Sequence, residues 1–305
     1  MRDLIIVGSG PAGLCAAIYG KRAGFDTLVI EETGVSGGQI LQTYEVDNYP
    51  GLPGISGFDL GMKMREHADK MGAEFLDATV TGLKDNENFK TIITNEGELE
   101  TRTVIIATGA AHNKLQVPGE EELTGMGVSY CATCDGAFFK NKVTIVVGGG
   151  DVAVEDAIFL ARTCSKVYLV HRRDSLRAAQ ILQQELFSMQ NVEMIWDSTV
   201  EKICGDGQVE SVIIKNVKSH ESRTVETDGV FVAVGIHPNT EAFAAAVNLD
   251  ASGYIQADET CRTNIPGIFA AGDNRTKRLR QVVTAVSDGA NAVTGVTEYF
   301  SGKNS

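Results

Sequence analysis

The chain has 305 residues, 43% of them hydrophobic, and a formal net charge of -13 from 27 basic and 40 acidic side chains. This length predicts two domains, each large enough to bury its own core. The acidic balance disfavours binding to nucleic acid or to an anionic membrane surface. Because no signal-peptide pattern opens the sequence and no run of about 18 apolar residues follows, we expect a cytoplasmic protein without a membrane span.

The first predicted element is an apolar strand at residues 4–7, followed by a glycine-rich turn and an Ala-rich helix that ends near Arg22. A second strand, residues 27–30, leads into Glu31 and Glu32. Strand, turn, helix and strand with an acid at the end are typical of dinucleotide-binding folds, in which the turn approaches a pyrophosphate and Glu31 faces ribose hydroxyls. The turn consists of Gly8, Ser9, Gly10, Pro11, Ala12 and Gly13.

Further along the chain, Cys131 and Cys134 are the closely spaced pair among six cysteines. Six cysteines in a cytoplasmic chain of this length do not indicate a disulfide scaffold. The spacing suits a helical turn on which two sulfurs share a face and can open or close a disulfide. Half of a zinc site is the alternative, but the histidines are scattered and no second pair completes four ligands.

Asp135 directly follows the cysteine pair. A thiol with an ordinary pKa is mostly protonated at neutral pH, so thiol chemistry needs a nearby acid or base. Asp135 is the adjacent candidate, provided that burial raises its pKa. The alternative, a solvated or helix-capping aspartate, stays open on the sequence alone.

The strand, turn and helix pattern recurs at residues 143–162, and this duplication predicts a second dinucleotide site. The next strand, residues 166–170, ends in a basic cluster instead of an acid. Guanidinium groups bind a ribose 2'-phosphate that a carboxylate would repel, so this site should select NADPH over NADH and leave the first site for FAD. Arg177 shares the face of the cluster if that segment is helical. The second turn consists of Gly148, Gly149, Gly150, Asp151, Val152 and Ala153, and the basic cluster of His171, Arg172, Arg173 and Arg177.

A third apolar strand, residues 268–273, has no glycine turn of its own and needs a sheet to join. We expect the chain to leave the first domain near Gly109 and return near Asn239, so that the tail completes the first sheet. The predicted fold class is α/β, with two Rossmann-like dinucleotide-binding domains, the NADPH domain inserted into a discontinuous FAD domain. The expected boundaries are 1–112 and 240–305 for the FAD-binding domain, and 113–239 for the NADPH-binding domain with the cysteine pair.

The two glycine turns, the CATCD segment at residues 131–135 and the HRRDSLRA segment at residues 171–178 stand in an order that resembles one known family. This family is that of the bacterial-type, low-molecular-weight NADPH-dependent thioredoxin reductases, which belong to the pyridine nucleotide-disulfide oxidoreductases. The resemblance covers essentially the whole chain. It includes the segments at residues 37–39, 46–51, 235–240, 271–273 and 280–284.

The resemblance implies that NADPH reduces FAD, that the flavin opens a Cys131–Cys134 disulfide, and that the dithiol reduces thioredoxin. It implies that Cys134 faces the flavin, that Cys131 attacks the partner's disulfide, and that Asp135 is the acid or base. It also implies a homodimer. Further FAD contacts implied in this way are Glu32, Gly38, Gln39, Asn48, Gly109, Gly272, Asp273, Gln281 and Val282.

Two departures from the family pattern stand out. Val152 lies where the family often has a hydroxyl residue, which removes one side-chain contact to the NADPH phosphates. Residues 274–278 are more basic than the pattern, which bears on the flavin edge or on the partner surface.

Related enzymes are the first alternative: a flavoprotein reductase that serves a peroxidase partner, or one fed by ferredoxin. The first would carry an additional N-terminal redox domain, for which a strand beginning at residue 4 leaves no room. The second would lack the basic cluster or the cysteine pair. A non-catalytic nucleotide sensor or zinc-holding scaffold is the alternative outside enzymes, and it would need no cysteine pair at this place.

Overall fold

The computed structural model describes residues 1–43, 45–46, 48–86 and 88–302. Asp47, which belongs to one of the resembling segments, lies outside the described residues. The chain folds into two compact units. Unit 1 comprises residues 1–41, 49–111 and 237–305, and unit 2 comprises residues 42–48 and 112–236.

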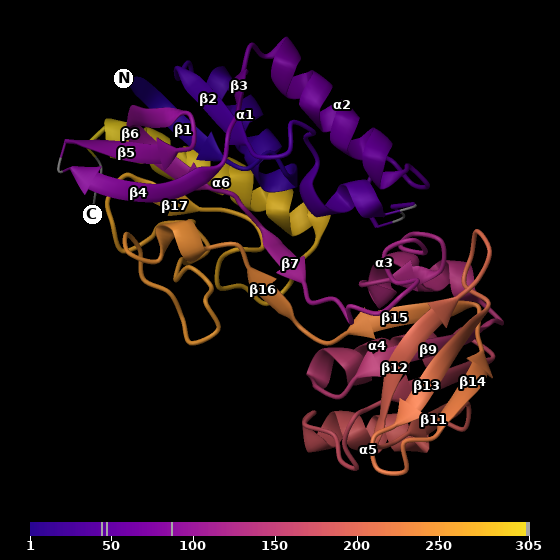
Figure 1. The fold of residues 1–305 in the computed structure, drawn as a ribbon. Helices are drawn as coiled ribbons and strands as arrows, with labels where there is room; N and C mark the ends of the chain where they lie inside the picture. Colours follow the sequence, from indigo (N-terminus) through magenta and orange to yellow (C-terminus); the bar gives the residue numbers. More distant parts are fainter. Residues whose placement is uncertain (44, 47, 87, 303–305) are drawn as a thin grey trace. The chain divides into compact units, whose positions relative to one another are not determined.

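Unit 1 is built on a mixed β-sheet that joins strands from both ends of the chain (Figure 1). Its strands are β1 (Arg2–Val7), β2 (Thr27–Glu31), β3 (Glu74–Asp77), β4 (Val80–Asn86), β5 (Phe89–Thr94), β6 (Gly97–Ile106) and β17 (Ile268–Ala270). β3, β2, β1 and β6 are parallel neighbours in that order, whereas β4, β5 and β6 are antiparallel. The second half of β6 pairs in parallel with β17, which confirms that the tail completes the first sheet.

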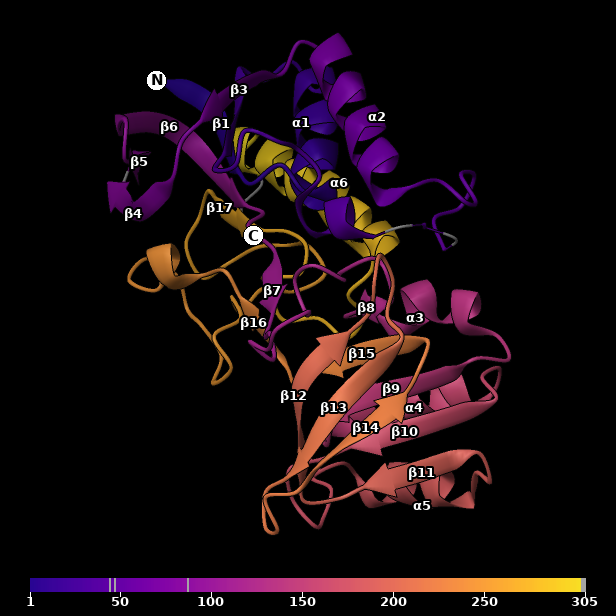
Figure 2. The same cartoon turned by 45° about the vertical axis from the view of Figure 1, so that its right-hand side comes forward.

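The helices of unit 1 are α1 (Pro11–Arg22), α2 (Gly57–Lys70) and α6 (Val282–Phe300), with the 3-10 turns η1 (Gly38–Gln42) and η3 (Glu241–Phe243). α1 and α6 lie side by side in both views (Figures 1 and 2). A Cβ at Gly289 of α6 would come 2.3 Å from the carbonyl oxygen of Ala12, so the two backbones meet without side chains between them. Leu14 of α1 and Val293 of α6 belong to the same buried hydrophobic core. Burying each such aliphatic side chain contributes roughly 1.5–3 kcal/mol.

Unit 2 contains a parallel sheet with the strand order β11-β10-β9-β15-β8 and a separate antiparallel sheet, β12-β13-β14. The parallel strands are β8 (Val128–Ser129), β9 (Val143–Gly148), β10 (Lys166–Val170), β11 (Val192–Ile195) and β15 (Gly229–Ala233), and the antiparallel ones are β12 (Ser198–Cys204), β13 (Ser211–Asn216) and β14 (Ser222–Glu226). The helices are α3 (Ala132–Asp135), the 3-10 turn η2 (Gly136–Phe139), α4 (Asp151–Ala161) and α5 (Gln180–Ser188). β9 and α4 therefore repeat the β1 and α1 arrangement, as the duplicated pattern predicts.

The chain passes between the units through β7 (Ala110–His112) and β16 (Ile236–Pro238), which pair with each other. Beside them, the N–H of Asn239 donates to the carbonyl oxygen of Gly109 over 3.0 Å. Two sheets with parallel strands, each with a glycine turn leading into a helix, confirm the predicted α/β fold class. Among the described residues, no helix combines the length and the apolar character needed to cross a membrane.

Candidate functional site

The first predicted nucleotide site lies where the parallel strands of unit 1 end. β1, β6 and β17 run in the same direction, so the glycines that follow them, Gly8, Gly109 and Gly272, lie at one edge of the sheet. Ligands of open α/β sheets bind at this edge. Gly38 from η1 also belongs there, because a Cβ on Gly38 would come 3.2 Å from the Cα of Gly10.

The glycines of the first turn meet different constraints. Gly8 has φ +101 and a Cβ there would lie 2.5 Å from the carbonyl oxygen of Ala107, while a Cβ on Gly13 would lie 1.9 Å from the carbonyl oxygen of Gly8. At Gly10, by contrast, nothing lies within 4 Å of an added Cβ. The backbone is thus open at the N-terminus of α1, where unpaired N–H groups and the helix dipole favour a pyrophosphate.

Glu31, the residue predicted to face a ribose, is bonded to the first glycine turn. Its carboxylate accepts hydrogen bonds from the backbone N–H and hydroxyl of Ser9, and from the N–H and hydroxyl of Thr33 at 3.0 and 2.9 Å. Burial raises the pKa of Glu31, but these hydrogen bonds outweigh burial and hold the pKa below its ordinary value. A carboxylate has about four acceptor positions, and a ribose hydroxyl has to share them with the two bonded residues.

Asp273, in the loop after β17, has a carboxylate oxygen that fits a ligand. Its Oδ1 is buried and has no hydrogen-bond partner among the described residues, and burial raises the pKa of the carboxyl. A buried acceptor without a partner is costly, so a hydroxyl donor from a bound molecule would satisfy it. The same loop leads to Gln281, which caps α6 through a reciprocal capping box with Thr284, and to Val282, the first residue of α6.

The other residues proposed for FAD differ in their surroundings. Ser9 and Ala12 are buried and Pro11 begins α1, so they shape the turn. Glu32 is exposed and accepts a hydrogen bond from the hydroxyl of Thr79 over 3.3 Å. Gln39 is exposed on η1, and Asn48 is exposed in the segment that belongs to unit 2.

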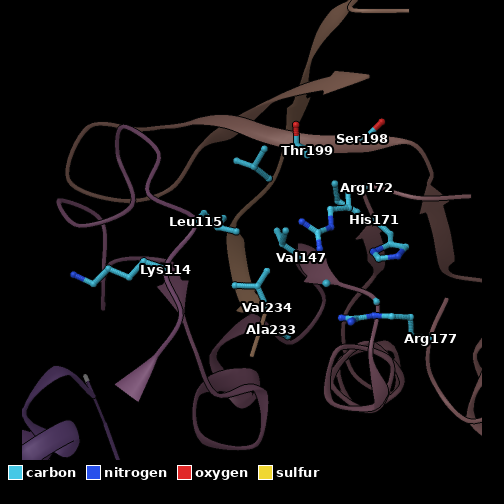
Figure 3. Close-up of a pocket in the computed structure, with 14 residues that line it drawn as sticks. Lys114, Leu115, Val147, His171, Arg172, Arg177, Ser198, Thr199, Ala233 and Val234 are labelled. Carbon is cyan, nitrogen blue, oxygen red and sulfur yellow. The ribbon is translucent and has the colours of Figure 1, made fainter. Parts of the chain in front are cut away.

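A cavity of about 310 Å³ lies at the carboxyl ends of the parallel strands of unit 2. Figure 3 shows His171, Arg172 and Arg177 gathered on one side of it and Lys114 on the other. Gly148 and Gly149 also line the cavity, whereas Arg173 is not among its lining residues. The remaining lining residues were not predicted from the sequence; they are Lys114, Leu115, Val147, Val170, Ser198, Thr199, Val200, Ala233 and Val234.

His171 packs directly against the second glycine turn. A Cβ on Gly149 would lie 2.3 Å from the imidazole ring, so only glycine leaves room for it. Burial lowers the pKa of His171, and the charges of Arg177, Arg173 and Arg172 lower it further. Its Nε2 is buried and has no partner within the described chain. The guanidinium groups of Arg172 and Arg177 therefore offer hydrogen-bond donors to an anion that enters the cavity.

Arg177 reaches this place without a helix. Residues 171–179 lie in bends and irregular backbone, and the backbone N–H of Arg177 donates to the carbonyl oxygen of Gly149 over 2.8 Å. A helical face therefore does not explain the position of Arg177. A long-range backbone hydrogen bond brings it to the turn.

The rest of the second turn resembles the first in its openness. Nothing lies within 4 Å of a Cβ on Gly150, which caps α4. Asp151 accepts a hydrogen bond from the N–H of Ala179 over 2.7 Å, and Ala153 is fully buried. Val152 is 62% exposed at the start of α4, and its apolar side chain offers no polar contact there.

Cys131 and Cys134 form a disulfide in unit 2, with their Cα atoms 5.3 Å apart. Cys131 has an extended backbone and caps the short helix α3, which contains Cys134. The N–H groups of Cys134 and Asp135 both donate to the carbonyl oxygen of Cys131, at 3.2 and 3.1 Å. The pair therefore joins an extended residue to a helical one, rather than two residues on one helical face.

Asp135 is held close to this disulfide by its own hydrogen bond. Its Oδ2 accepts the hydroxyl proton of Ser129 over 2.6 Å, and its Oδ1 is buried without a partner among the described residues. Burial raises the pKa of Asp135, and the hydrogen bond from Ser129 lowers it only in part. A carboxyl with a raised pKa keeps its proton to a higher pH than an ordinary aspartate does, which is the property that an acid in thiol chemistry needs.

The four other cysteines do not join this site. Cys15, Cys164 and Cys261 are buried, and Cys204 is half-buried. Burial raises the pKa of Cys15 to about 11 and that of Cys261 to about 12, so both thiols stay protonated at neutral pH. Within the described residues, no group of three or more His, Cys, Asp or Glu side chains is arranged to hold a metal ion.

Comparison with known proteins places these features in one class. The family model of the pyridine nucleotide-disulphide oxidoreductases matches residues 2–289. The chain therefore belongs to the pyridine nucleotide-disulphide oxidoreductase family. Two Rossmann-like sheets and a disulfide next to a buried carboxyl agree with membership of this family.

Several of the similar proteins are named thioredoxin reductase. The chain is 51% identical over 298 residues to a thioredoxin reductase of Listeria innocua, covering 97% of this chain and 93% of the relative. It is 46% identical over 298 residues to the thioredoxin reductase of Bacillus subtilis, covering 97% and 94%. The solved thioredoxin reductase of Streptococcus pyogenes shares 46% identity, covers 99% of both chains and has a TM-score of 0.95.

Proposed function

We propose that this protein is a thioredoxin-disulfide reductase that passes electrons from NADPH through FAD and the Cys131–Cys134 disulfide to thioredoxin. The observation that carries the proposal is the disulfide beside Asp135, a buried carboxyl with a raised pKa, in the unit that also holds an arginine-lined cavity. The relatives that carry the name thioredoxin reductase support it. They do not favour the peroxidase-linked or ferredoxin-linked alternatives.

The two nucleotides are assigned by the chemistry of the two sites. For FAD, bound by residues 1–112 and 240–305, the support is the open backbone at Gly10 and the unpartnered Oδ1 of Asp273. For NADPH, bound by residues 113–239, the support is the cavity with Arg172 and Arg177, because guanidinium groups pair with a 2'-phosphate. When bound, FAD would supply the two-electron chemistry that links NADPH to the Cys131–Cys134 disulfide.

The residues of the chain then carry the thiol chemistry. Opening the Cys131–Cys134 bond takes two electrons and leaves two sulfurs as thiolates. Cys134 faces the flavin, and the thiolate of Cys131 attacks the disulfide of thioredoxin, so that a mixed disulfide forms and one thioredoxin sulfur leaves. The thiolate of Cys134 then attacks Cys131, which restores the disulfide and releases the second sulfur. Asp135 provides the proton that a leaving sulfur takes up.

We also assign the protein to the cytoplasm as a homodimer. Thioredoxin systems keep thiols reduced in that compartment, which supports the location. The resemblance to the family supports the dimer. Light scattering coupled to gel filtration measures the mass of the particle directly, and a particle of one chain would overturn the dimer without touching the enzymatic proposal.

The enzymatic proposal is tested with the purified protein. We expect a yellow protein whose flavin absorbance is bleached without oxygen much faster by NADPH than by NADH, and which reduces thioredoxin with NADPH. Cys134→Ser should keep the bleaching by NADPH and lose thioredoxin reduction, because the dithiol cannot form. A colourless protein, an equal response to both nucleotides, or thioredoxin reduction by Cys134→Ser would overturn the proposal.

A further inference from the structure

Ser129 contacts both parts of the site already described: the backbone of Cys131 and the carboxyl of Asp135. It is the last residue of β8, and it is aligned with Phe231 of β15 in the parallel sheet of unit 2. Ser129 is only 5% exposed. A residue on a paired strand keeps its position better than one in a loop, so Ser129 is a rigid point of reference.

The hydroxyl of Ser129 makes one hydrogen bond in each direction. Its oxygen accepts the backbone N–H of Cys131 over 3.0 Å, and its proton goes to Oδ2 of Asp135 over 2.6 Å. A hydroxyl has a single proton, and the alternative acceptor, the carbonyl oxygen of Cys131, is farther away at 3.4 Å. A hydroxyl that accepts one hydrogen bond donates the next more strongly, so the two bonds reinforce each other.

These bonds leave the sulfurs free to react. Cys131 is held at its N–H by Ser129 and at its carbonyl oxygen by the N–H groups of Cys134 and Asp135. None of these contacts uses a sulfur atom. Oδ2 of Asp135 accepts the hydrogen bond from Ser129, so Oδ1 is the carboxyl oxygen left without a partner among the described residues.

We propose that Ser129 is a positioning residue for the dithiol chemistry, whose hydroxyl fixes the carboxyl of Asp135 and the backbone of Cys131 as one unit. This inference rests on the proposed function. When a disulfide bond breaks, the leaving sulfur takes the electron pair of that bond and the proton from Oδ1 of Asp135. Asp135 is left as a carboxylate, which the hydrogen bond from Ser129 stabilises.

The direction of the effect on pH follows from this geometry. Burial raises the pKa of Asp135 and the bond from Ser129 lowers it, so removal of the hydroxyl raises the pKa further. An acid is active in its protonated form, so activity is lost as the pH rises through the pKa. Ser129→Ala should therefore move the alkaline limb of the pH–rate profile upward by about one unit, since hydrogen bonds to charged groups are of that size. The maximum rate should fall about tenfold, a part of the usual acid-base contribution.

Thr227 offers a matched control in the same unit. It is also 5% exposed, its hydroxyl accepts the N–H of Gly229 over 3.4 Å, and its proton has the carbonyl oxygens of Val143 and Gly229 as acceptors, each at 3.0 Å. Thr227→Val removes a buried hydroxyl with the same two roles and leaves Asp135 unchanged. It should lower the melting temperature much as Ser129→Ala does, without any shift of the pH profile.

The experiment measures thioredoxin reduction by the holoenzyme from pH 5 to 10 for the wild type, Ser129→Ala and Thr227→Val. If Ser129→Ala does not fold, Ser129→Thr and Ser129→Val form a second pair of equal shape, in which only threonine keeps the hydroxyl. We expect the shifted profile in Ser129→Val and the wild-type profile in Ser129→Thr. A profile of Ser129→Ala or Ser129→Val that matches the wild type would overturn the role of Ser129. A wild type that reduces no thioredoxin would instead overturn the proposed function.

A second readout does not depend on turnover. In each protein, reduced chemically and freed of reductant, the rate at which iodoacetamide alkylates the dithiol is followed against pH. Loss of the bond from Ser129 to the backbone of Cys131 should change the inflection of this curve in Ser129→Ala and leave it unchanged in Thr227→Val. Identical curves for the three proteins would count against the positioning of Cys131.

Discussion

Arg275 and Asp288 form a buried ion pair in which both carboxylate oxygens are bonded, from Nε over 2.9 Å and from Nη2 over 2.7 Å. Lys277 adds a third cationic contact to Asp288 at 2.8 Å, and the backbone N–H of Gly272 donates to the same carboxylate over 2.9 Å. The basic segment at residues 274–278 thus directs two of its cations into unit 1, against α6. In this way Asp288 fixes the loop that presents Asp273.

Asp288→Asn should destabilise unit 1 by about 3–5 kcal/mol, because Arg275 and Lys277 would remain buried without the carboxylate that bonds both of them. The other carboxylate near Arg275, that of Glu259 at 3.6 Å, is 90% exposed and replaces little of this interaction. Burial alone raises the pKa of Asp288, but the hydrogen bonds from Arg275 and Lys277 outweigh it and the pKa lies below its ordinary value. This contribution to stability is therefore complete above the unfolded pKa of about 3.9 and is lost as the pH falls through the folded pKa. Urea unfolding as a function of pH measures both effects.

A surface pair provides the control for that prediction. Arg262 and Glu298 are bonded on unit 1 with side chains 34% and 45% exposed. Solvent screens such a pair, so Glu298→Gln should cost only about 0–1 kcal/mol. Equal losses of unfolding free energy in Asp288→Asn and Glu298→Gln would mean that the buried pair stabilises unit 1 no more than the surface pair does.

Gly10→Ala and Gly13→Ala should separate cofactor binding from folding. The added methyl group at Gly10 enters open space, so the apoprotein should fold with unchanged stability while its FAD affinity drops, because that space is where we place the pyrophosphate. At Gly13 the methyl group would meet the carbonyl oxygen of Gly8 at 1.9 Å, which should disrupt the packing of α1 itself. Flavin content and thermal unfolding of the apoproteins are the measurements. Unchanged FAD affinity in Gly10→Ala would remove the pyrophosphate from this place.

Arg177→Ala should raise the KM for NADPH about 10–100-fold and leave the KM for NADH nearly unchanged, since hydrogen bonds between ions are worth roughly 1.5–3 kcal/mol. Steady-state kinetics with both nucleotides provides the comparison. Arg162→Ala is the control, because Arg162 is exposed and pairs with Glu185 away from the cavity. An equal loss for both nucleotides would show that Arg177 does not contact the 2'-phosphate.

Acid should release the flavin through Glu31. The pKa of Glu31 is lowered by its bonds to Ser9 and Thr33, so the bonded turn is stable above the ordinary pKa of about 4.3 and is lost as the pH falls through the folded value. The rise in free-flavin fluorescence on acidification reports this loss. Glu31→Gln should hold FAD more weakly at neutral pH and respond less to acid, while Glu98→Gln, a change in an exposed pair with Lys84, should behave as the wild type. A wild-type acid response in Glu31→Gln would assign the release to another group.

Much of the fold was predictable because local patterns specify it. The apolar strands before Gly8 and Gly148 and the helices after them follow from hydrophobic periodicity and turn chemistry within about 20 residues. The antiparallel strands β4, β5 and β12 to β14 were not predicted, since their polar and apolar alternation is weak and their partners are set by neighbouring strands.

The candidate site divides in the same way. Cys131, Cys134 and Asp135 carry an explicit chemical pattern, so the sequence indicates them. Ser129 carries none: its contact with Asp135 depends on the short helix between them and on the pairing of β8 with β15, a strand about one hundred residues away. The cavity-lining Lys114 and Ser198 were missed for the same reason, because tertiary structure alone brings them to the second turn.

The pairing of β17 with β6 sets an order for folding during synthesis. The parallel sheet of unit 2 takes all its strands from residues between Val128 and Ala233, so it can form while the ribosome is still translating the tail. Until β17 emerges, the backbone of β6 from Val104 to Ile106 is an unpaired strand edge that can join a neighbouring chain. Translation that stops before residue 268 would therefore yield chains with a complete unit 2 and an aggregation-prone unit 1.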